Sequence, residues 1–151
     1  MIELNRTFLG RLSEQLSDLI EQQSAEVFKR AGLVLPVKSS SLLVAIATLG
    51  PVSVADLVRA LDRSHQLIQQ KVPKLVKLGL VTRQPDPDDQ RVTLIEITDS
   101  GREQLVLLES LDGEFIRAYA EMEEEAGPVF DSINRAILSL KSRPLIDRMV
   151  V

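Results

Sequence analysis

The sequence contains no cysteine and only one histidine in 151 residues. The lack of cysteine excludes disulfides, thiolate metal ligands and thiol-based redox switches, and a single histidine argues against a dedicated zinc site. No apolar run reaches the length of a membrane span, and the N-terminal residues mix apolar side chains with acids and bases, unlike a signal peptide. We therefore expect a soluble, cytoplasmic protein that has no membrane partner and binds no metal or cofactor.

The sequence also lacks the usual signatures of catalysis. It has no nucleophile elbow, no phosphate-binding glycine loop and only one histidine to act as a base. The run EMEEE at 121–125 suggests a metal site at first sight, but consecutive acids on a helix point in different directions and usually form a solvated face. The sequence therefore predicts no catalytic residue, and the chain is not expected to be an enzyme.

Basic residues are outnumbered by acidic ones overall, with 18 Lys and Arg against 22 Asp and Glu, but they are concentrated in one segment. The net charge is −4, yet the stretch from Arg63 to Arg83 holds five basic residues and no acidic one, whereas residues 105–151 carry nine acids against five bases. A basic segment inside an acidic protein indicates a localised anionic partner. At this length, with 44% hydrophobic residues, the chain is predicted to form a single domain over 1–151.

The first part of the chain is predicted to form two helices. Apolar residues at helical spacing indicate a long amphipathic helix to about Arg30, ended by Gly32. Pro36 suits the first turn of a second helix, which runs to the break at Gly50 and Pro51. The spaced apolar residues of the first helix are Leu4, Phe8, Leu12, Leu16, Leu19, Ile20 and Val27.

Two further helices follow. Ser53 and Asp56 form the Ser/Thr-x-x-Asp/Glu pattern of a helix start, which opens a short helix to about Leu61. Ser64 is the predicted N-cap of the next helix, and Gly79 is placed to end it in a left-handed conformation.

A β-hairpin and two more helices complete the chain. Residues 80–84 and 92–98 are rich in β-branched side chains and are separated by a turn rich in proline and aspartate. Thr98 is predicted to cap a fifth helix that runs to Ala126, and Gly127–Pro128 separate it from a sixth.

This order of elements is a helix-turn-helix followed by a wing. We therefore predict a mainly α fold with a small β-hairpin wing, in which residues 36–104 form the winged helix-turn-helix unit. The flanking helices, within 1–31 and 105–151, are too apolar on one side to be covered by so small a unit. Pairing with a second copy would bury them, so a homodimer is expected.

The most specific motif lies in the wing. Arg83 is followed by PDPDDQR, the strand VTLIEI and the sequence TDSG, with Asp89 and Arg91 in an Asp-x-Arg pattern and Ile97 before the threonine. In these features, and over most of its length, the chain resembles the multiple antibiotic resistance regulator (MarR) family of bacterial transcription regulators, where a leucine usually replaces Ile97. The resemblance implies a homodimeric winged-helix repressor or activator that binds double-stranded DNA. A small-molecule effector is a further partner that it implies.

The fourth predicted helix has two distinct sides. Ile68, Val72, Leu75 and Val76 share one side, which is predicted to enter the core, and the opposite side is polar. A polar side is either an ordinary solvated face or, beside such a wing, a surface whose amides read base edges and whose lysines bind guanine or phosphate. The candidate DNA-binding residues are Ser53, Ser64, His65, Gln66, Gln69, Gln70, Lys74, Lys77 and Arg91. Lys71 and Arg83 are expected to help Lys74 and Lys77 neutralise phosphate.

Several candidates have alternative roles. Ser53 either binds phosphate or is a plain N-cap, and His65 either approaches a phosphate or base edge or serves in packing. Arg91 either pairs with Asp89 to stabilise the wing or extends into the minor groove, and the resemblance implies both.

Pro73 interrupts the hydrogen bonding of the fourth helix. It lacks a backbone N–H and frees the carbonyl of Gln69, at about 3 kcal/mol in an ordinary helix interior. On the exposed side this carbonyl can be hydrated while the helix bends around its packed face. We therefore expect base contacts from the first two turns, Ser64 to Gln70.

The sequence leaves open which macromolecule the winged unit binds and whether a small ligand binds near its core residues. A winged-helix module that binds a protein instead of DNA also fits the interrupted helix, the acidic wing tip and the negative net charge. A small ligand would lie where the flanking helices meet the winged unit, near Phe28, Leu33 and Leu43, which are equally ordinary core residues.

Overall fold

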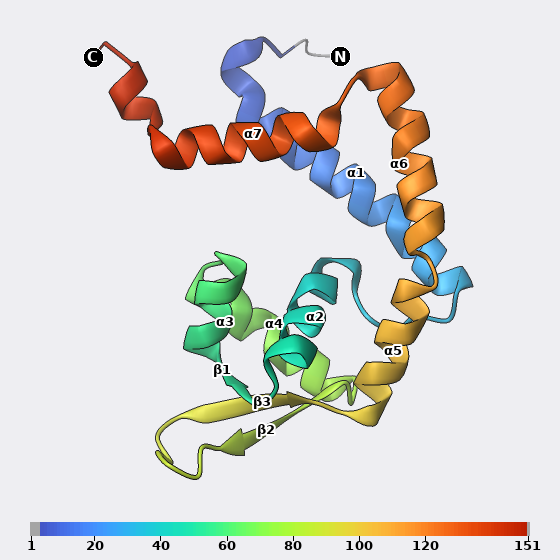
Figure 1. Ribbon diagram of the computed structural model, residues 1–151, viewed down its shortest axis with the longest axis vertical. Helices are drawn as coiled ribbons and strands as arrows, with labels where there is room; N and C mark the ends of the chain where they lie inside the picture. Colours follow the sequence, from blue (N-terminus) through green and yellow to red (C-terminus); the bar gives the residue numbers. More distant parts are fainter. Residues whose placement is uncertain (1–3, 151) are drawn as a thin grey trace. The chain divides into compact units, whose positions relative to one another are not determined.

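The computed structural model describes residues 4–150 as helices joined to one small antiparallel sheet (Figure 1). The α-helices are α1 (Leu9–Arg30), α2 (Ser40–Leu49), α3 (Val54–Leu61), α4 (His65–Lys77), α5 (Asp99–Glu109), α6 (Asp112–Ala126) and α7 (Val129–Ser142). Three short 3-10 helices are η1 (Arg6–Phe8), η2 (Val37–Ser39) and η3 (Leu145–Arg148). The strands are β1 (Val52–Ser53), β2 (Val81–Pro85) and β3 (Thr93–Ile97). The predicted mainly α fold with a small β wing is confirmed.

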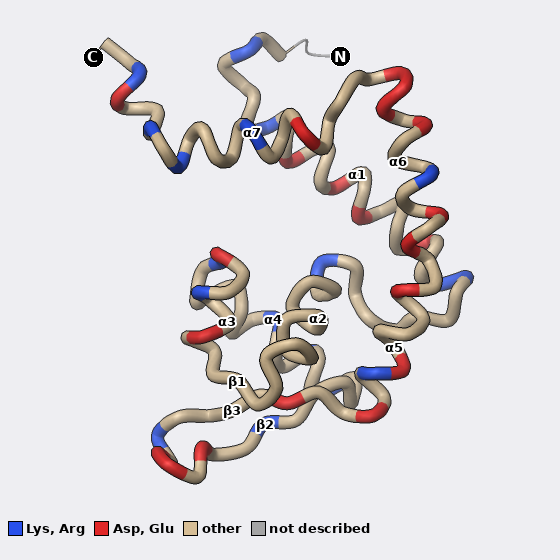
Figure 2. Tube along the Cα trace, viewed as in Figure 1, with Lys and Arg blue, Asp and Glu red and all other residues tan. Residues whose placement is uncertain are grey.

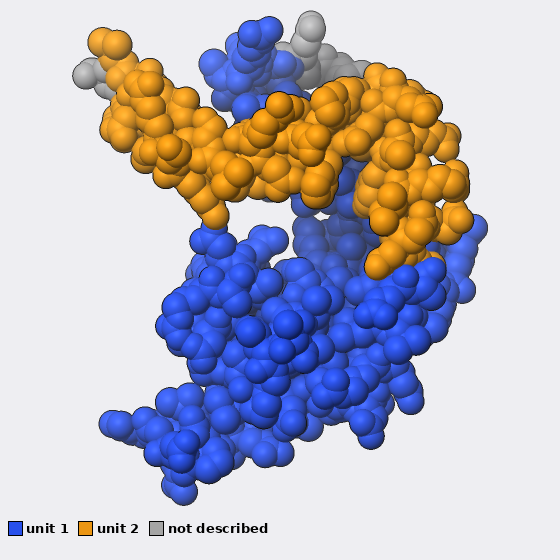
Figure 3. Space-filling model, in the orientation of Figure 1, with its two compact units in different colours: residues 1–110 blue, residues 111–151 orange. Residues whose placement is uncertain are grey.

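The chain divides into two compact units, coloured separately in Figure 3. The first ends at Ser110 and contains α1 to α5 with the sheet, and the second begins at Leu111 and contains α6, α7 and η3. Residues 1–3 and 151, at the ends of the predicted flanking segments, lie outside the described residues. Between residues 4 and 150, no helix is both long enough and apolar enough to cross a membrane.

The core of the first unit lies where α2, α3 and α4 pack over the sheet (Figure 1). The predicted inner side of α4 is in this core, since Ile68, Val72 and Leu75 are buried. The other side chains with almost no exposed surface come from α2, α3, the start of β2 and the residue before it, and the centre of β3. They are Leu42, Leu43, Ile46, Leu57, Leu80, Val81 and Ile95.

The sheet has one strand more than the predicted hairpin. Its order is β1-β3-β2, and β1 pairs antiparallel with β3 through Val52 and Ile95. The prediction of a two-stranded hairpin was therefore incomplete. Strand β1 is only two residues long and lies between the break at Gly50 and the helix cap at Ser53, so it is too short to show an alternating pattern.

The predicted fifth helix is wrong in its length. It ends at Glu109, and α6 begins at Asp112 after a break at Ser110 and Leu111. The Ser110 hydroxyl donates to the Leu107 carbonyl (2.6 Å), a local hydrogen bond that competes with continued helix. Gly113, shortly after the break, further weakens the helical preference of this stretch.

Thr98 joins the end of α4 to the start of α5. Its hydroxyl donates to the Gly79 carbonyl (2.6 Å) and accepts from the Gly101 N–H (3.1 Å), which confirms the predicted N-cap. Its own N–H donates to the Leu80 carbonyl (3.0 Å). The helix end at Gly79 (φ 73°), which is left-handed as predicted, is thereby fixed against α5.

Gly101 allows this close approach because it has no Cβ. A Cβ built at this position would overlap the backbone carbonyl of Leu80 and lie 2.6 Å from Cγ1 of Ile97. A backbone carbonyl cannot move aside like the end of a flexible side chain, so the start of α5 can pack here only with glycine.

A buried glutamine fixes the segment between α1 and α2. The Gln104 side chain is 9% exposed, and its Oε1 accepts from the N–H groups of Val34 (2.7 Å) and Leu35 (3.0 Å). These two donors lie outside any helix or strand, so Gln104 supplies the acceptor that secondary structure would otherwise provide. The position of this segment therefore depends on α5.

We predict that Gly101→Ala lowers the free energy of unfolding by about 2 kcal/mol or more, because the methyl group meets fixed backbone. Chemical denaturation at fixed protein concentration measures this. Gly10→Ala is the matched control, since a Cβ there meets nothing within 4 Å. Equal stability of Gly101→Ala and the parent would contradict the packing described here.

Gln104→Ala is expected to cost about 2 kcal/mol, because it leaves two backbone donors without their acceptor. Its neighbour Glu103 is exposed, so Glu103→Ala should change the free energy of unfolding by less than about 0.5 kcal/mol. The same denaturation experiment compares the two variants, and an equal small effect in both would show that Gln104 does not hold the segment.

Candidate nucleic-acid interface

The outer side of α4 is a continuous polar surface. Because Ile68, Val72 and Leu75 point into the core, the side chains between them face outward, except for the half-buried Lys71. All the candidate residues of this helix and its cap are exposed, namely Ser64, His65, Gln66, Gln69, Gln70, Lys74 and Lys77. Acidic side chains are absent from α4, and no ion pair within residues 4–150 involves Lys74 or Lys77.

The starts of α3 and α4 are capped by serine. The Ser64 hydroxyl accepts from the Leu67 N–H (3.2 Å), as predicted. The Ser53 hydroxyl is half-buried, accepts from the Asp56 N–H (3.1 Å) and donates to the Asp56 carboxylate (2.8 Å). This bond to Ser53, with a further contribution from Arg59, holds the pKa of Asp56 below its ordinary value. The Asp56 carboxylate thus lies at the start of α3, where it bonds the Ser53 hydroxyl. The start of α4 is exposed and has no acidic side chain in its first turn.

Pro73 lies inside α4, and the helix continues through it to Lys77. Its ring is exposed, on the polar side of the helix, as the sequence predicts. The hydrogen bond that Pro73 cannot form is therefore missing on the solvent side of the helix, where water can bind the freed Gln69 carbonyl.

Lys71 differs from the other basic residues of α4. Its side chain is half-buried, and its ammonium donates to the backbone carbonyl of Lys38 in η2. Lys38 in turn forms ion pairs with Glu21 (2.7 Å) and Asp18 (3.4 Å) of α1. The sequence pattern, which placed Lys71 with the phosphate-binding lysines, could not reveal this arrangement because the contacts join residues 17 to 33 positions apart.

The turn of the wing is held by two aspartates. The Asp86 carboxylate accepts from the Asp88 N–H (2.9 Å), and Asp89 accepts from the backbone N–H (3.1 Å) and the guanidinium of Arg91 (3.1 and 3.3 Å). The bond from the Arg91 side chain, followed by that from its backbone, lowers the pKa of Asp89. The Arg91 side chain remains 91% exposed, so it forms this pair while facing solvent. Acidic and basic positions lie next to one another along the trace of this turn, between β2 and β3 (Figure 2).

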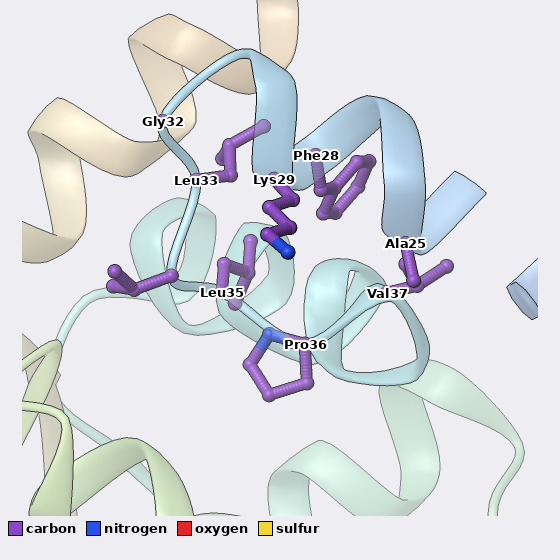
Figure 4. Close-up of a pocket in the computed structure, with 9 residues that line it drawn as sticks. Ala25, Phe28, Lys29, Gly32, Leu33, Leu35, Pro36 and Val37 are labelled. Atoms are coloured by element: carbon purple, nitrogen blue, oxygen red, sulfur yellow. The ribbon is translucent and has the colours of Figure 1, made fainter. Parts of the chain in front are cut away.

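A shallow pocket lies between the end of α1 and the segment that leads to η2 (Figure 4). Its volume is about 310 Å³, and its walls are mainly apolar, with Phe28, Leu33, Leu35 and Pro36 among them. Leu43, which the sequence grouped with Phe28 and Leu33, has no exposed surface and does not line the pocket.

These elements define a winged helix-turn-helix. Helix α3 and helix α4 are joined by a tight turn at Asp62, which is left-handed (φ 51°), and the β2–β3 hairpin follows α4 as the wing. A sequence model of the MarR family matches residues 35–92, which cover the turn, α4 and most of the wing. The winged-helix unit of this chain is therefore similar to that of the MarR family.

A curated relative is similar to part of the chain. YdgJ of Bacillus subtilis (strain 168), described as an uncharacterized HTH-type transcriptional regulator, is 32% identical over 54 residues. The match covers 36% of this chain and 33% of YdgJ, so the chain spans about a third of that relative's length.

Solved structures show the same fold over most of the chain. The MepR–DNA complex of S. aureus superposes with a TM-score of 0.69 at 19% identity, and the match covers 91% of this chain and 100% of MepR. The transcriptional repressor CouR bound to a DNA duplex gives a TM-score of 0.65 at 18% identity, covering 94% of this chain and 100% of CouR. At these identities the likeness establishes the fold alone.

We predict that the pKa of the Asp89 carboxyl lies below the ordinary value of an aspartate and that Arg91→Ala raises it toward that ordinary value. Because the folded pKa is depressed, the order that this pair gives the wing is present above the ordinary aspartate pKa and is lost as the pH falls through the lower pKa of the folded state. Carboxyl chemical shifts followed by NMR against pH measure both quantities. Arg83→Ala is the control and should leave the Asp89 titration unchanged; if Arg91→Ala also leaves it unchanged, Arg91 is not the cause.

Proposed function

We propose that this chain is a sequence-specific DNA-binding transcription regulator that acts as a homodimer. The observation that carries the proposal is the outer side of α4: its glutamine amides and unpaired lysines are exposed, while its inner side is fixed in the core. Amides can pair with adenine edges, and lysines can bind guanine acceptors or phosphates. We assign base contacts to the first two turns of α4, and phosphate contacts to Lys74 and Lys77.

The wing supplies the second contact in this proposal. Arg91 is exposed and projects from a turn that the aspartates hold in place, so it can enter a narrow minor groove. The three aspartates of the turn make the wing tip acidic, so we expect it to add less affinity than α4.

The proposed dimer would cover apolar surface that each unit leaves exposed. Helix α1 exposes Phe8 at its start and Leu9, Leu12, Leu19 and Val27 along its length. In the second unit, α7 exposes Phe130, Ile133, Ile137, Leu138 and Leu140. Exposed apolar side chains grouped along a helix mark an interaction surface, and we assign both groups to pairing between copies. In this proposal residues 1–31 and 105–151 form the dimer, and residues 36–104 bind DNA.

We further propose that the chain is a repressor, in line with the description of CouR. The pocket beside Phe28 and Leu33 is the proposed place for a small effector, since its walls are mainly apolar. The expected site of action is the cytoplasm, where bacterial DNA lies, and similarity to a family of transcription regulators gives no reason to propose an enzymatic activity.

The test is selection of duplexes from a random pool by the purified protein. We expect the parent to enrich one family of sites, Gln70→Ala to lose preference at defined positions, and Lys74→Ala to weaken binding to all sites alike. The salt slope of Lys74→Ala should fall by about 0.9, because one phosphate contact is lost.

Glu103→Ala is the control, because it removes an exposed charge from α5 that lies outside the proposed dimer segments and is given no contact with DNA. It should enrich the same sites as the parent. If the parent enriches no sequence and binds duplex without salt dependence, the DNA-binding assignment fails, and the winged-helix module that binds a protein becomes the better account.

A further inference from the structure

A chain of polar contacts connects α4 to α1 within the first unit. The Lys71 ammonium, on α4, donates to the Lys38 carbonyl in η2. The Lys38 ammonium lies 2.7 Å from the Glu21 carboxylate and 3.4 Å from that of Asp18, both on α1. One residue of η2 thus receives a bond from α4 through its backbone and gives bonds to α1 through its side chain.

The surroundings of Lys71 separate it from the exposed lysines of the same helix. Burial is the main cause that lowers its pKa, and repulsion from Arg63 and Lys38 adds to this effect. By contrast, pairing with Glu21 raises the pKa of Lys38. Lys71 therefore carries its charge in a partly desolvated position among other cations, and the Lys38 carbonyl is the acceptor that offsets this.

We propose that Lys71 is a positioning residue that tethers α4 to α1 through Lys38, and that it does not bind DNA phosphate. The inference rests on the proposed function, in which α1 belongs to the dimer and α4 reads DNA. In such a dimer, the α1 helix of each copy fixes the position of the α4 helix of that copy. The tether therefore helps to set the distance and angle at which the two α4 helices contact one duplex.

A second interpretation makes opposite predictions. Arg63, Lys38 and Lys71 lie near one another, and such a cluster of cations could bind a phosphate directly. Lys38 is already paired with two carboxylates, however, which reduces the positive charge of the cluster. The two interpretations differ in whether Lys71 releases counterions when DNA binds.

The experiment measures affinity for the selected duplex as a function of salt for the parent, Lys71→Met and Lys74→Met. The two variants each remove one cation from α4, three residues apart. For Lys71→Met we expect about fivefold weaker binding or more with an unchanged salt slope, since only the coupling to α1 is lost. For Lys74→Met the slope should fall by about 0.9.

Lys38→Met tests the same tether from an exposed position and serves if Lys71→Met does not fold. It too should weaken binding without changing the slope. The double variant Lys38→Met/Lys71→Met should lose less affinity than the sum of the two single losses, because both changes break the same connection.

Lys71→Arg keeps a donor and should retain most of the affinity of the parent. Circular dichroism and thermal melting establish that each variant is folded at the assay temperature.

The outcomes are distinguishable. A parent protein without salt-dependent binding overturns the proposed function and this inference with it. If the parent binds but Lys71→Met shows the reduced slope of Lys74→Met, Lys71 contacts phosphate and only the tether is wrong. Folded Lys71→Met and Lys38→Met variants with parental affinity would likewise overturn the tether while leaving DNA binding intact.

Discussion

Burial of Ile68, Val72 and Leu75 decides what the opposite side of α4 can do. Burying each of these side chains contributes roughly 1.5–3 kcal/mol, which together exceeds the cost of about 3 kcal/mol for a proline in a helix interior. The helix therefore continues through Pro73, and its register relative to the core is fixed. Gln66, Gln70 and the two exposed lysines face outward as a consequence of this packing.

The charge of α4 is divided by the same packing. The sequence pattern does not distinguish its three lysines, but their surroundings in the structure differ. Lys74 and Lys77 are exposed on the outer side, whereas Lys71 reaches back to the Lys38 carbonyl and so toward α1. A count of basic residues thus overstates the charge that α4 offers to an anionic partner, and one of its cations serves the internal arrangement of the first unit.

Local patterns were sufficient to predict the winged unit. The caps at Ser53, Ser64 and Thr98 and the left-handed Gly79 were each predicted from signals within a few residues, and all are present. The sequence did not reveal β1, the break after Glu109, the Gln104 bonds or the Lys71–Lys38 contact. These depend on very short segments, on a competing hydroxyl or on partners distant in sequence, where periodicity carries no information. The outer side of α4 was predicted as a surface, but its partner follows only from the family and the proposed chemistry.

In the proposed complex, two copies of the chain hold their α4 helices on one face of a duplex. Because the sequence has no cysteine, Leu78→Cys places one spin label per chain at an exposed position just after α4, outside the proposed base and phosphate contacts. Pulsed electron paramagnetic resonance on the complex with the selected duplex measures the distance between the two labels. The account predicts a narrow distribution centred near 34 Å, about one helical turn of DNA, widened by the label arms. Two results would contradict this arrangement. One is the absence of any intermolecular distance, and the other is a distribution that stays broad and far from about 34 Å when duplex is added.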